Sequence, residues 1–381
     1  MRMMIISPYH GGSHRVWAEG ISKHSKYHVD LLTLPARFWK WRMHGGAVTL
    51  ARRFLEIDQL PDLLLATDML DMATFLALTR KRTSKIPTVL YMHENQLTYP
   101  LPKDGSTGPM RRQLGERDRH YAFINFTSMM AADCILFNSH HHYDSFFAAL
   151  LPFLKHFPEY NELGSIENLR AKSEVLHVGI DLCRLDREIG QPKPNMMSPA
   201  APLILWNQRW EYDKNPEEFF AALFTLADEG ILFRVALCGQ QYGKRPSSFN
   251  AGLERLADRI IQEGFVSPEK YSQLLWDADI VVSTAYHEFF GISIVEAIYA
   301  QTFPILPRRL SYPELLPDDA HGHCLYDSQV GLLERLRWAI YHRQEATSLA
   351  QEWALSMARY DWAQMGSVYD QLLIRCAGRT V

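Results

Sequence analysis

Short runs of consecutive apolar residues, many of them β-branched, recur along the whole 381-residue chain. Such runs are typical of strands in a parallel sheet, because helices cover both faces and leave no solvated face to be polar. We predict six of these strands before Asp181 and six after Pro202. They span residues 3–7, 29–34, 63–67, 88–93, 134–138 and 175–178, then 203–206, 233–238, 260–265, 280–283, 303–306 and 323–326.

Helix-length segments separate most of the predicted strands, for example 216–228 and 267–276. The second of these opens with Ser267, a favourable N-cap residue, and Pro268, which is preferred in a first helical turn. Alternation of strands and helices on this scale predicts an α/β protein with parallel sheets.

The two sets of strands are separated by a proline-rich stretch at residues 191–202. We therefore predict two Rossmann-like domains, at 1–182 and 200–359, with a ligand cleft between them. The final segment, at about 360–381, has the pattern of an amphipathic helix.

One strand–turn–helix unit in the second domain is the most informative stretch of the chain. The predicted strand 280–283 leads to the turn Glu288-Phe-Phe-Gly291, and a helix that contains Glu296 follows. A glycine turn at a helix N-terminus binds anions, because unpaired N–H groups and the helix dipole face one point. A site whose backbone amides bind a phosphate and whose two carboxylates bind hydroxyl groups suits a nucleotide sugar. An ordinary strand–helix crossover with two solvated glutamates is the alternative.

Two cations follow the first strand of the second domain. Arg209 and Lys214 lie in the loop Trp206-Asn-Gln-Arg-Trp-Glu-Tyr-Asp-Lys214. Fixed positive charges in a water-poor site stabilise a diphosphate as it becomes a leaving group. A solvated pair of side chains is the alternative.

Polar and glycine residues also follow several strands of the first domain. A glycine-containing loop at 7–14 opens the first helix, and Ser13 is its predicted N-cap. Because carboxyl ends of parallel strands meet at one edge of a sheet, these loops should face a common ligand crevice. The candidate contacts are His10 and Gly12 after the first strand, Asp68 after the third, and His93, Glu94, Asn95, Gln96 and Tyr99 after the fourth. A tight turn and a core histidine are the alternatives.

The sequence offers no convincing metal site. Asp277 and Asp279 form an Asp-x-Asp pair, but they precede a buried strand and are expected to be helix-end aspartates. The five cysteines are dispersed and lack the spacing of metal ligands, which suits a protein of the reducing cytoplasm. The longest apolar stretch is far shorter than the roughly 20 residues of a membrane span, so no transmembrane segment is expected.

The Glu288–Glu296 pattern behind a buried strand, with its preceding cations, resembles the retaining nucleotide-sugar glycosyltransferases of family 4, which have the GT-B fold. The resemblance implies a last helix that crosses back onto the first domain. It implies that His93 and Glu288 are catalytic and orient the donor sugar. It also implies that the donor is bound by Gly12, Arg209, Lys214, the amides of Phe290, Gly291 and Ile292, and Glu296, which meets the ribose.

Motifs of the first domain narrow this resemblance. They are His93-Glu-Asn-Gln-Leu-Thr-Tyr-Pro100, the stretch 117–125, Asn138-Ser139, Asp68-Met-Leu-Asp71 and Trp206-Asn-Gln-Arg-Trp-Glu211. Together they resemble the family 4 enzymes that place mannose on queuosine in a tRNA anticodon. The resemblance implies GDP-mannose as donor substrate, queuosine-containing tRNA as partner and no metal cofactor. It further implies that the strand-end residues His10, Asp68, Glu94, Asn95, Gln96 and Tyr99 bind the acceptor.

The segment 35–44 independently suggests an RNA partner. Arg37, Trp39, Lys40 and Arg42 alternate cations with aromatic rings, and single-stranded RNA is bound by such combinations of stacking and phosphate contacts. The chain carries a net charge of −3, but its basic residues are in excess before Asp181. A helix whose tryptophans pack inward is the alternative.

Three other functions remain open from the sequence, and one of them is a GT-B epimerase. A family 4 enzyme could act on a lipid-linked or cell-envelope acceptor, with the apolar stretch 146–154 facing a membrane. A non-catalytic RNA-binding protein could reuse the fold, although the intact Glu288, Glu296, Arg209 and Lys214 argue against it.

Overall fold

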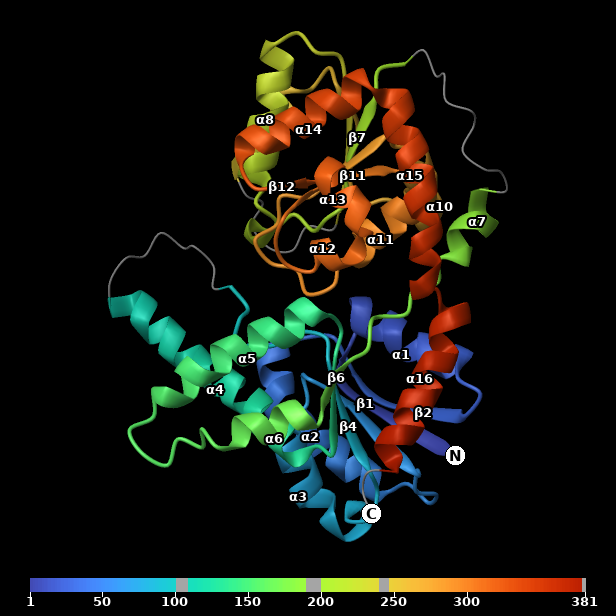
Figure 1. The fold of residues 1–381 in the computed structure, drawn as a ribbon. Coiled ribbons are helices and arrows are strands. Elements are labelled where there is room, and N and C mark those ends of the chain that lie inside the picture. Colours follow the sequence, from blue (N-terminus) through green and yellow to red (C-terminus); the bar gives the residue numbers. More distant parts are fainter. Residues whose placement is uncertain (101–108, 190–199, 240–246, 379–381) are drawn as a thin grey trace. The chain divides into compact units, whose positions relative to one another are not determined.

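The computed structural model of the protein describes residues 1–100, 109–189, 200–239 and 247–378, with side chains omitted at 109–118 and 187–189 (Figure 1). The chain divides into two compact units. The first comprises Met1–Ile180 and the segment from Trp362 onward, and the second comprises Asp181–Asp361. Most of the proline-rich stretch 191–202 lies outside the described residues.

The first unit holds a parallel six-stranded sheet in the order β2-β1-β3-β4-β5-β6. Its strands are β1 (Arg2–His10), β2 (His28–Pro35), β3 (Leu63–Thr67), β4 (Thr88–Met92), β5 (Cys134–Phe137) and β6 (Ser173–Val175). Its helices are α1 (Gly12–His24), α2 (Trp39–Leu55), α3 (Met72–Thr83), α4 (Pro109–Ala131), α5 (His140–Lys155) and α6 (Ser165–Ala171). Every residue of β3, β4 and β5 is buried, which explains their continuous apolar runs.

The second unit holds another parallel six-stranded sheet, in the order β12-β11-β10-β7-β8-β9. Its strands are β7 (Leu203–Trp206), β8 (Arg234–Cys238), β9 (Ile260–Gly264), β10 (Ile280–Val282), β11 (Phe303–Pro307) and β12 (Leu325–Tyr326). Its α-helices are α7 (Cys183–Ile189), α8 (Pro216–Asp228), α9 (Ser247–Arg255), α10 (Pro268–Asp277), α11 (Ile292–Tyr299), α12 (Tyr312–Leu315), α13 (His321–Cys324), α14 (Gln329–Tyr341) and α15 (Arg343–Met357). Short 3-10 turns lie at Tyr212–Lys214, Asp318–Ala320 and Ala358–Tyr360.

The predicted fold class of two Rossmann-like α/β sheets is confirmed, and two strands begin two residues away from their expected starts. The last strand was expected at 323–326 but spans Leu325–Tyr326, because His323 and Cys324 end helix α13. The sixth strand was expected at 175–178 but spans Ser173–Val175. Its neighbour β5 ends at Phe137, which pairs with Val175, so the ladder has no partner for later residues. The N-cap at Ser267 is also confirmed, because its hydroxyl accepts a hydrogen bond from the Lys270 N–H.

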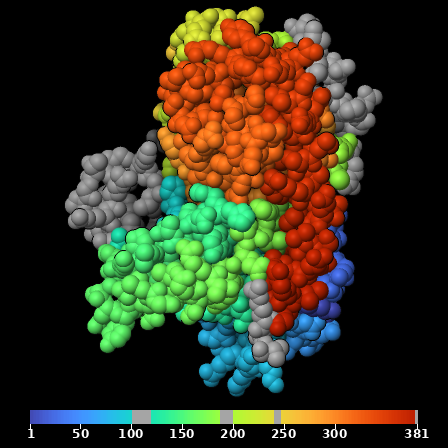
Figure 2. All heavy atoms as spheres, viewed as in Figure 1, coloured from blue at the N-terminus to red at the C-terminus, as the bar shows by residue number. Residues whose placement is uncertain are grey.

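The helix α16 (Trp362–Ala377) belongs to the first unit and packs against α1. It is drawn in red (Figures 1 and 2). The Trp362 indole lies between Gly20 and Gly179, where an added Cβ would come within 2.3 and 2.6 Å of its ring. The Tyr369 hydroxyl accepts a hydrogen bond from Trp17 Nε1 at 2.9 Å. The end of the chain therefore supports α1, which carries residues of the candidate site.

Three local expectations need correction. The dispersed cysteines gave no sign of a pair, yet Cys134 on β5 and Cys376 on α16 form a disulfide, with Cα atoms 5.9 Å apart. Helix α1 begins at Gly12 after Gly11 as N-cap, so Ser13 lies inside the first turn and does not cap it. The apolar stretch 146–154 does not form an exposed surface, because Phe146 and Leu150 are fully buried in the core. None of the described helices is long and apolar enough to cross a membrane.

Candidate active site

The turn between β10 and α11 has the geometry of an anion site. Gly291 is the N-cap of α11 and has a φ of 99°, a left-handed conformation that favours glycine. Ser311 Oγ donates a hydrogen bond of 2.8 Å to the Phe290 carbonyl and fixes the turn from the other side. Because α11 begins at Ile292, its first N–H groups have no acceptor within the helix and are oriented toward the turn.

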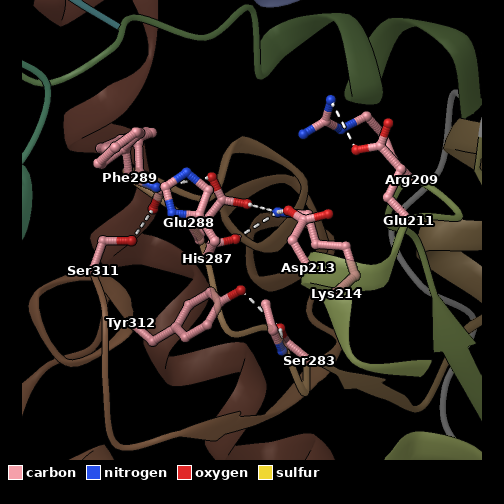
Figure 3. A network of polar contacts seen from close by, with 12 residues as sticks. Arg209, Glu211, Asp213, Lys214, Ser283, His287, Glu288, Phe289, Ser311 and Tyr312 are labelled. Carbon is pink, nitrogen blue, oxygen red and sulfur yellow. Dashed lines mark hydrogen bonds and ion pairs between the residues drawn. The ribbon is translucent and has the colours of Figure 1, made fainter. Parts of the chain in front are cut away.

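Lys214 supplies a buried positive charge to this turn (Figure 3). Its ammonium donates to the His287 carbonyl at 2.7 Å and to Glu288 Oε2 at 3.2 Å, and lies 3.3 Å from Asp213 Oδ2. The Lys214 side chain is only 5% exposed, so water screens this charge weakly. The loop after β7 thus brings a cation to the carboxylate that the sequence places 74 residues later.

The Glu288 carboxylate is held in its charged form. Burial acts to raise its pKa, but Lys214, together with His287 and Arg209, outweighs burial, so the pKa of Glu288 lies below its ordinary value. Arg209 itself is more open, with a side chain 45% exposed and 3.3 Å from Glu211 Oε2. The two predicted cations therefore differ. The Lys214 ammonium is buried against the turn between β10 and α11, whereas the Arg209 side chain is exposed to solvent.

Glu296 has two partners that the sequence did not reveal. Arg184 Nη2 donates to its Oε1, and the Tyr271 hydroxyl donates to its Oε2, both at 3.0 Å. Tyr271 in turn accepts a hydrogen bond from Asn207 Nδ2 at 3.2 Å. Burial raises the pKa of Glu296, and Arg184 and Tyr271 act against that shift. Asn207 stands in the quoted 206–211 motif, but no pattern marked Arg184 or Tyr271.

In the first unit, buried polar side chains hold the loop after β4. Asp68 Oδ1 accepts a hydrogen bond from the His93 N–H, and Asn138 Nδ2 donates to the His93 carbonyl, both at 2.9 Å. Asn125 Oδ1 accepts from the Gln96 N–H at 2.9 Å, and Asn95 Oδ1 accepts from the N–H groups of the two residues that follow Gln96. Asp68 and Asn95 are almost fully buried. They position the loop, and their contact with an acceptor stays a prediction.

The His93 imidazole lies in a cluster of aromatic rings. Its centroid is 4.2 Å from that of His14, 4.6 Å from that of Trp17 and 4.7 Å from that of Tyr91. Burial lowers the pKa of His93 well below its ordinary value, and nearby His14 adds to the shift. Its Nε2 is buried and has no hydrogen-bond partner among the described residues. A neutral imidazole with an unpartnered nitrogen is suited to bind a ligand hydroxyl.

The other predicted residues that follow strands of this unit lie at the same edge of the sheet. Gly12 adopts a left-handed φ of 53° at the start of α1. His10 Nε2 lies 3.5 Å from Glu19 Oε1, and the Glu94 carboxylate accepts from Gln96 Nε2 at 3.0 Å. Tyr99 is partly buried. Their roles stay predictions.

Of the two aspartates that were set aside as metal ligands, Asp277 is the exposed last residue of α10, and Asp279 has a structural role. Asp279 accepts a hydrogen bond from the Leu203 N–H and pairs with Arg343 at 2.8 Å. In the part of the chain that the structure describes, no group of three or more histidine, cysteine, aspartate or glutamate side chains could hold a metal ion.

Comparison with known sequences decides the family. The family model described as tRNA-queuosine alpha-mannosyltransferase N-terminal matches residues 2–180, and that described as Glycosyl transferases group 1 matches residues 193–352. A tRNA-queuosine alpha-mannosyltransferase of Drosophila melanogaster is 32% identical over 342 residues, which cover 88% of this chain and 85% of the relative. The chain belongs to the tRNA-queuosine alpha-mannosyltransferase family. It is therefore a glycosyltransferase, as its motifs predicted.

Two more distant similarities agree with a glycosyltransferase and with the fold. A GDP-mannose-dependent alpha-(1-6)-phosphatidylinositol dimannoside mannosyltransferase of Mycobacterium tuberculosis is 23% identical over 171 residues, or 44% of this chain and 42% of the relative. The crystal structure of HepE from Anabaena in complex with UDP superposes with a TM-score of 0.66 at 14% identity, covering 98% of this chain and 100% of that one. The expected GT-B fold is confirmed by this likeness.

Buried histidines should make the protein less stable in acid. Burial lowers the pKa of both His14 and His287 to about 4. Between that value and about pH 6.5 the unfolded chain binds more protons than the folded one, so stability falls as the pH falls. Each histidine should cost about 2 kcal/mol of unfolding free energy between about pH 7.5 and about pH 5.

Urea unfolding of the wild type and of His14→Gln at both pH values measures this effect. The substitution should remove about 2 kcal/mol of the pH dependence. Replacing the exposed His28, which pairs with Asp30, with alanine is the control and should leave most of the pH dependence in place. An unaltered pH dependence in His14→Gln would show that His14 is not a neutral buried group.

Proposed function

We propose that the protein transfers mannose from GDP-mannose to queuosine at the wobble position of a tRNA anticodon, with retention of anomeric configuration. The family of the chain supports the acceptor, and the name of the mycobacterial relative supports the donor. The observation that carries the chemistry is the pair of the buried Lys214 with the partly exposed Glu288 at the start of α11. It places a cation and a carboxylate beside helix N–H groups, as a diphosphate with an attached sugar requires.

The second unit supplies the groups that bind the donor. The diphosphate lies at the amides of Phe290, Gly291 and Ile292, and Lys214 and Arg209 neutralise it. Negative charge grows on the diphosphate as its bond to the sugar breaks, so a buried cation stabilises the transition state more than the ground state. Glu296 accepts one hydrogen bond on each oxygen from protein groups and keeps further lone pairs for ribose hydroxyls.

The transfer needs no covalent intermediate with the protein. The bond from the anomeric carbon to the phosphate oxygen breaks, and a queuosine hydroxyl oxygen bonds to the same face of that carbon. The acceptor proton passes to the departing diphosphate oxygen. Glu288 and the neutral His93 orient the sugar hydroxyls, while the loop contacts of Asp68 and Asn138 keep His93 in place.

The basic aromatic segment of the first unit supports an RNA acceptor. Helix α2 begins at Trp39, and the Lys40 ammonium lies 5.3 Å from the Trp39 ring centroid. Trp41 is 64% exposed, so the tryptophans do not pack inward together. Arg37 is also exposed. Rings and cations accessible on one helix start suit unpaired bases and phosphates.

We predict that turnover requires no divalent metal. The diphosphate is neutralised by Lys214, Arg209 and helix N–H groups, so a metal ion has no electrostatic role left to fill. The initial rate with GDP-mannose and tRNA should change less than about twofold when EDTA replaces magnesium, provided the tRNA is folded beforehand. Loss of activity in EDTA that manganese or magnesium restores would contradict this prediction.

The second candidate is transfer to a lipid-linked or cell-envelope acceptor. The name of the mycobacterial relative contains a phosphatidylinositol substrate, which favours this alternative. However, the stretch 146–154 that could have faced a membrane is mostly buried in α5.

We also place the reaction in the cytoplasm. The cysteines do not support this location, because Cys134 and Cys376 form a disulfide.

One assay separates the two acceptors. The protein is incubated with GDP-mannose and either total tRNA or a total lipid extract, and digested nucleosides and lipids are analysed by mass spectrometry. Our proposal predicts a hexose on queuosine nucleoside and none on lipid. Hexose on lipid alone would replace the proposal with the second candidate.

A further inference from the structure

Four aromatic rings from two helices form a cluster on the surface of the first unit. We call Trp39 and His44 of α2, with His120 and Tyr121 of α4, the ring platform. Ring centroids are 3.9 Å apart for His120 and Tyr121, 4.9 Å for His44 and His120, 5.2 Å for His44 and Tyr121, and 5.3 Å for Trp39 and Tyr121. The Lys40 ammonium lies 5.3 and 5.6 Å from the centroids of Trp39 and Tyr121.

The ring platform is only partly explained by packing. Tyr121 is buried in a small cluster with Met43 and Met69, against which Trp39 packs. His44 and His120 are exposed, yet their rings are stacked at an interplanar angle of 12° with their Nε2 atoms 2.9 Å apart. Two stacked imidazoles at the surface bury little apolar area. The imidazoles do present flat π-faces, and the Lys40 cation lies over the neighbouring rings of Trp39 and Tyr121. Unpaired bases are bound by this combination of aromatic faces and a cation.

Ring contacts connect the platform to His93. Tyr9, at the end of β1, packs against the Met43–Met69–Tyr121 cluster. The Tyr9 centroid lies 5.9 Å from that of His14, and His14 lies 4.2 Å from His93. This path follows the carboxyl edge of the sheet, where β1 and β4 end and α2 follows β2. The platform therefore lies on the same edge as the histidine assigned to the reacting sugar.

We infer that the ring platform stacks unpaired anticodon-loop bases that neighbour the nucleotide being modified. Arg37 and Lys40 then meet the phosphates of the same loop, and His93 meets the sugar at the wobble position. The inference rests on the proposed function and specifies how the acceptor is held. A single-stranded loop fits better than a membrane surface, because the exposed rings of the platform are imidazoles and not apolar side chains.

A stacking surface is tested with the double variant His44→Ala/His120→Ala. Both side chains are exposed, so folding should survive, and thermal unfolding checks this. The probes are an anticodon stem–loop RNA with queuosine at the wobble position and a loop-free duplex with the same number of phosphates. The control is His28→Ala, an exposed histidine at the amino end of β2, the opposite edge of the same sheet.

The double variant should bind the stem–loop about tenfold more weakly than the wild type does, with duplex binding unchanged. Its salt dependence should keep the wild-type slope, because no phosphate contact is lost. Replacing Arg37, Lys40 and Arg42 together should instead weaken binding of both RNAs and flatten the log–log salt slope by about 0.7–0.9 per contact. His28→Ala should behave as the wild type.

Wild-type affinity of the double variant for the stem–loop, or equal losses on stem–loop and duplex, would overturn the inference. A wild type that does not bind the stem–loop would overturn it too. The outcome is separable from that of the proposed function. If the wild type mannosylates queuosine tRNA and the double variant keeps its KM, the inference alone fails. If stem–loop binding depends on the platform but no mannose is transferred, the proposed function alone fails.

Discussion

Replacing Lys214 with methionine should lower kcat by about two to three orders of magnitude, which is the usual loss when one preorganised group that stabilises developing negative charge is removed. The Lys214 ammonium is buried, lies 3.2 Å from Glu288 and is the strongest influence that keeps the Glu288 pKa low. Without it, the leaving diphosphate loses its fixed cation, and burial should shift Glu288 toward its protonated form. Steady-state rates with saturating GDP-mannose and tRNA measure the effect.

The same substitution should lower stability, because Glu288 and Asp213 lose their buried partner. Removing one side of a buried ion pair costs about 3–5 kcal/mol, so kcat must be measured at a temperature where unfolding curves show the variant to be folded. Arg337→Met is the matched control, since Arg337 forms an exposed pair with Glu229 in the same unit. If folded Lys214→Met keeps kcat within about threefold of the wild type, the assignment of Lys214 to the leaving group fails.

Alanine at Glu296 and at Glu288 should separate donor binding from turnover. Glu296→Ala removes the hydrogen-bond acceptor that we propose for the ribose and leaves Arg184 and Tyr271 without their carboxylate. The free energy of binding GDP-mannose should weaken by about 1–3 kcal/mol, which raises the dissociation constant about 5- to 140-fold, with a smaller change in kcat. Glu288→Ala should mainly lower kcat, because its contact with the sugar matters most near the transition state.

Calorimetric titration with GDP-mannose and steady-state kinetics give the two quantities. Glu229→Ala is the control, an exposed carboxylate of the same unit whose loss should change neither. Equal losses of donor affinity in both variants, with turnover untouched, would show that the two glutamates do not have the separate roles assigned to them.

The elements of the fold could be predicted because their signals are local. Strands such as β3 and β7 are buried on both faces, so their apolar runs mark their ends directly in the sequence. The cap at Ser267 depends on neighbouring residues only. The predicted bounds of β6 were wrong because the end of this strand is set by its pairing with β5. The local sequence of β6 carries no signal of where β5 ends.

The candidate site could be predicted only in part, for the same reason. The turn at Gly291 and its two glutamates are local, and the sequence identifies them. The partners of those glutamates come from far along the chain: Arg184 reaches Glu296 across 112 positions, and Lys214 reaches Glu288 across 74. His44 and His120 are likewise 76 positions apart. No spacing rule links such pairs, because the packing of whole helices and strands brings them together.

The central claim is that queuosine in tRNA is the acceptor. Two preparations of one tRNA, with queuosine or with guanosine at the wobble position, are incubated with the protein and GDP-mannose. They are then digested and their nucleosides analysed by mass spectrometry and by the anomeric configuration of any attached sugar. Our account predicts one hexose on queuosine, with the anomeric configuration of the donor, and none on the guanosine-containing tRNA. Equal modification of both tRNAs, or modification of neither under conditions where the protein binds GDP-mannose, would contradict it.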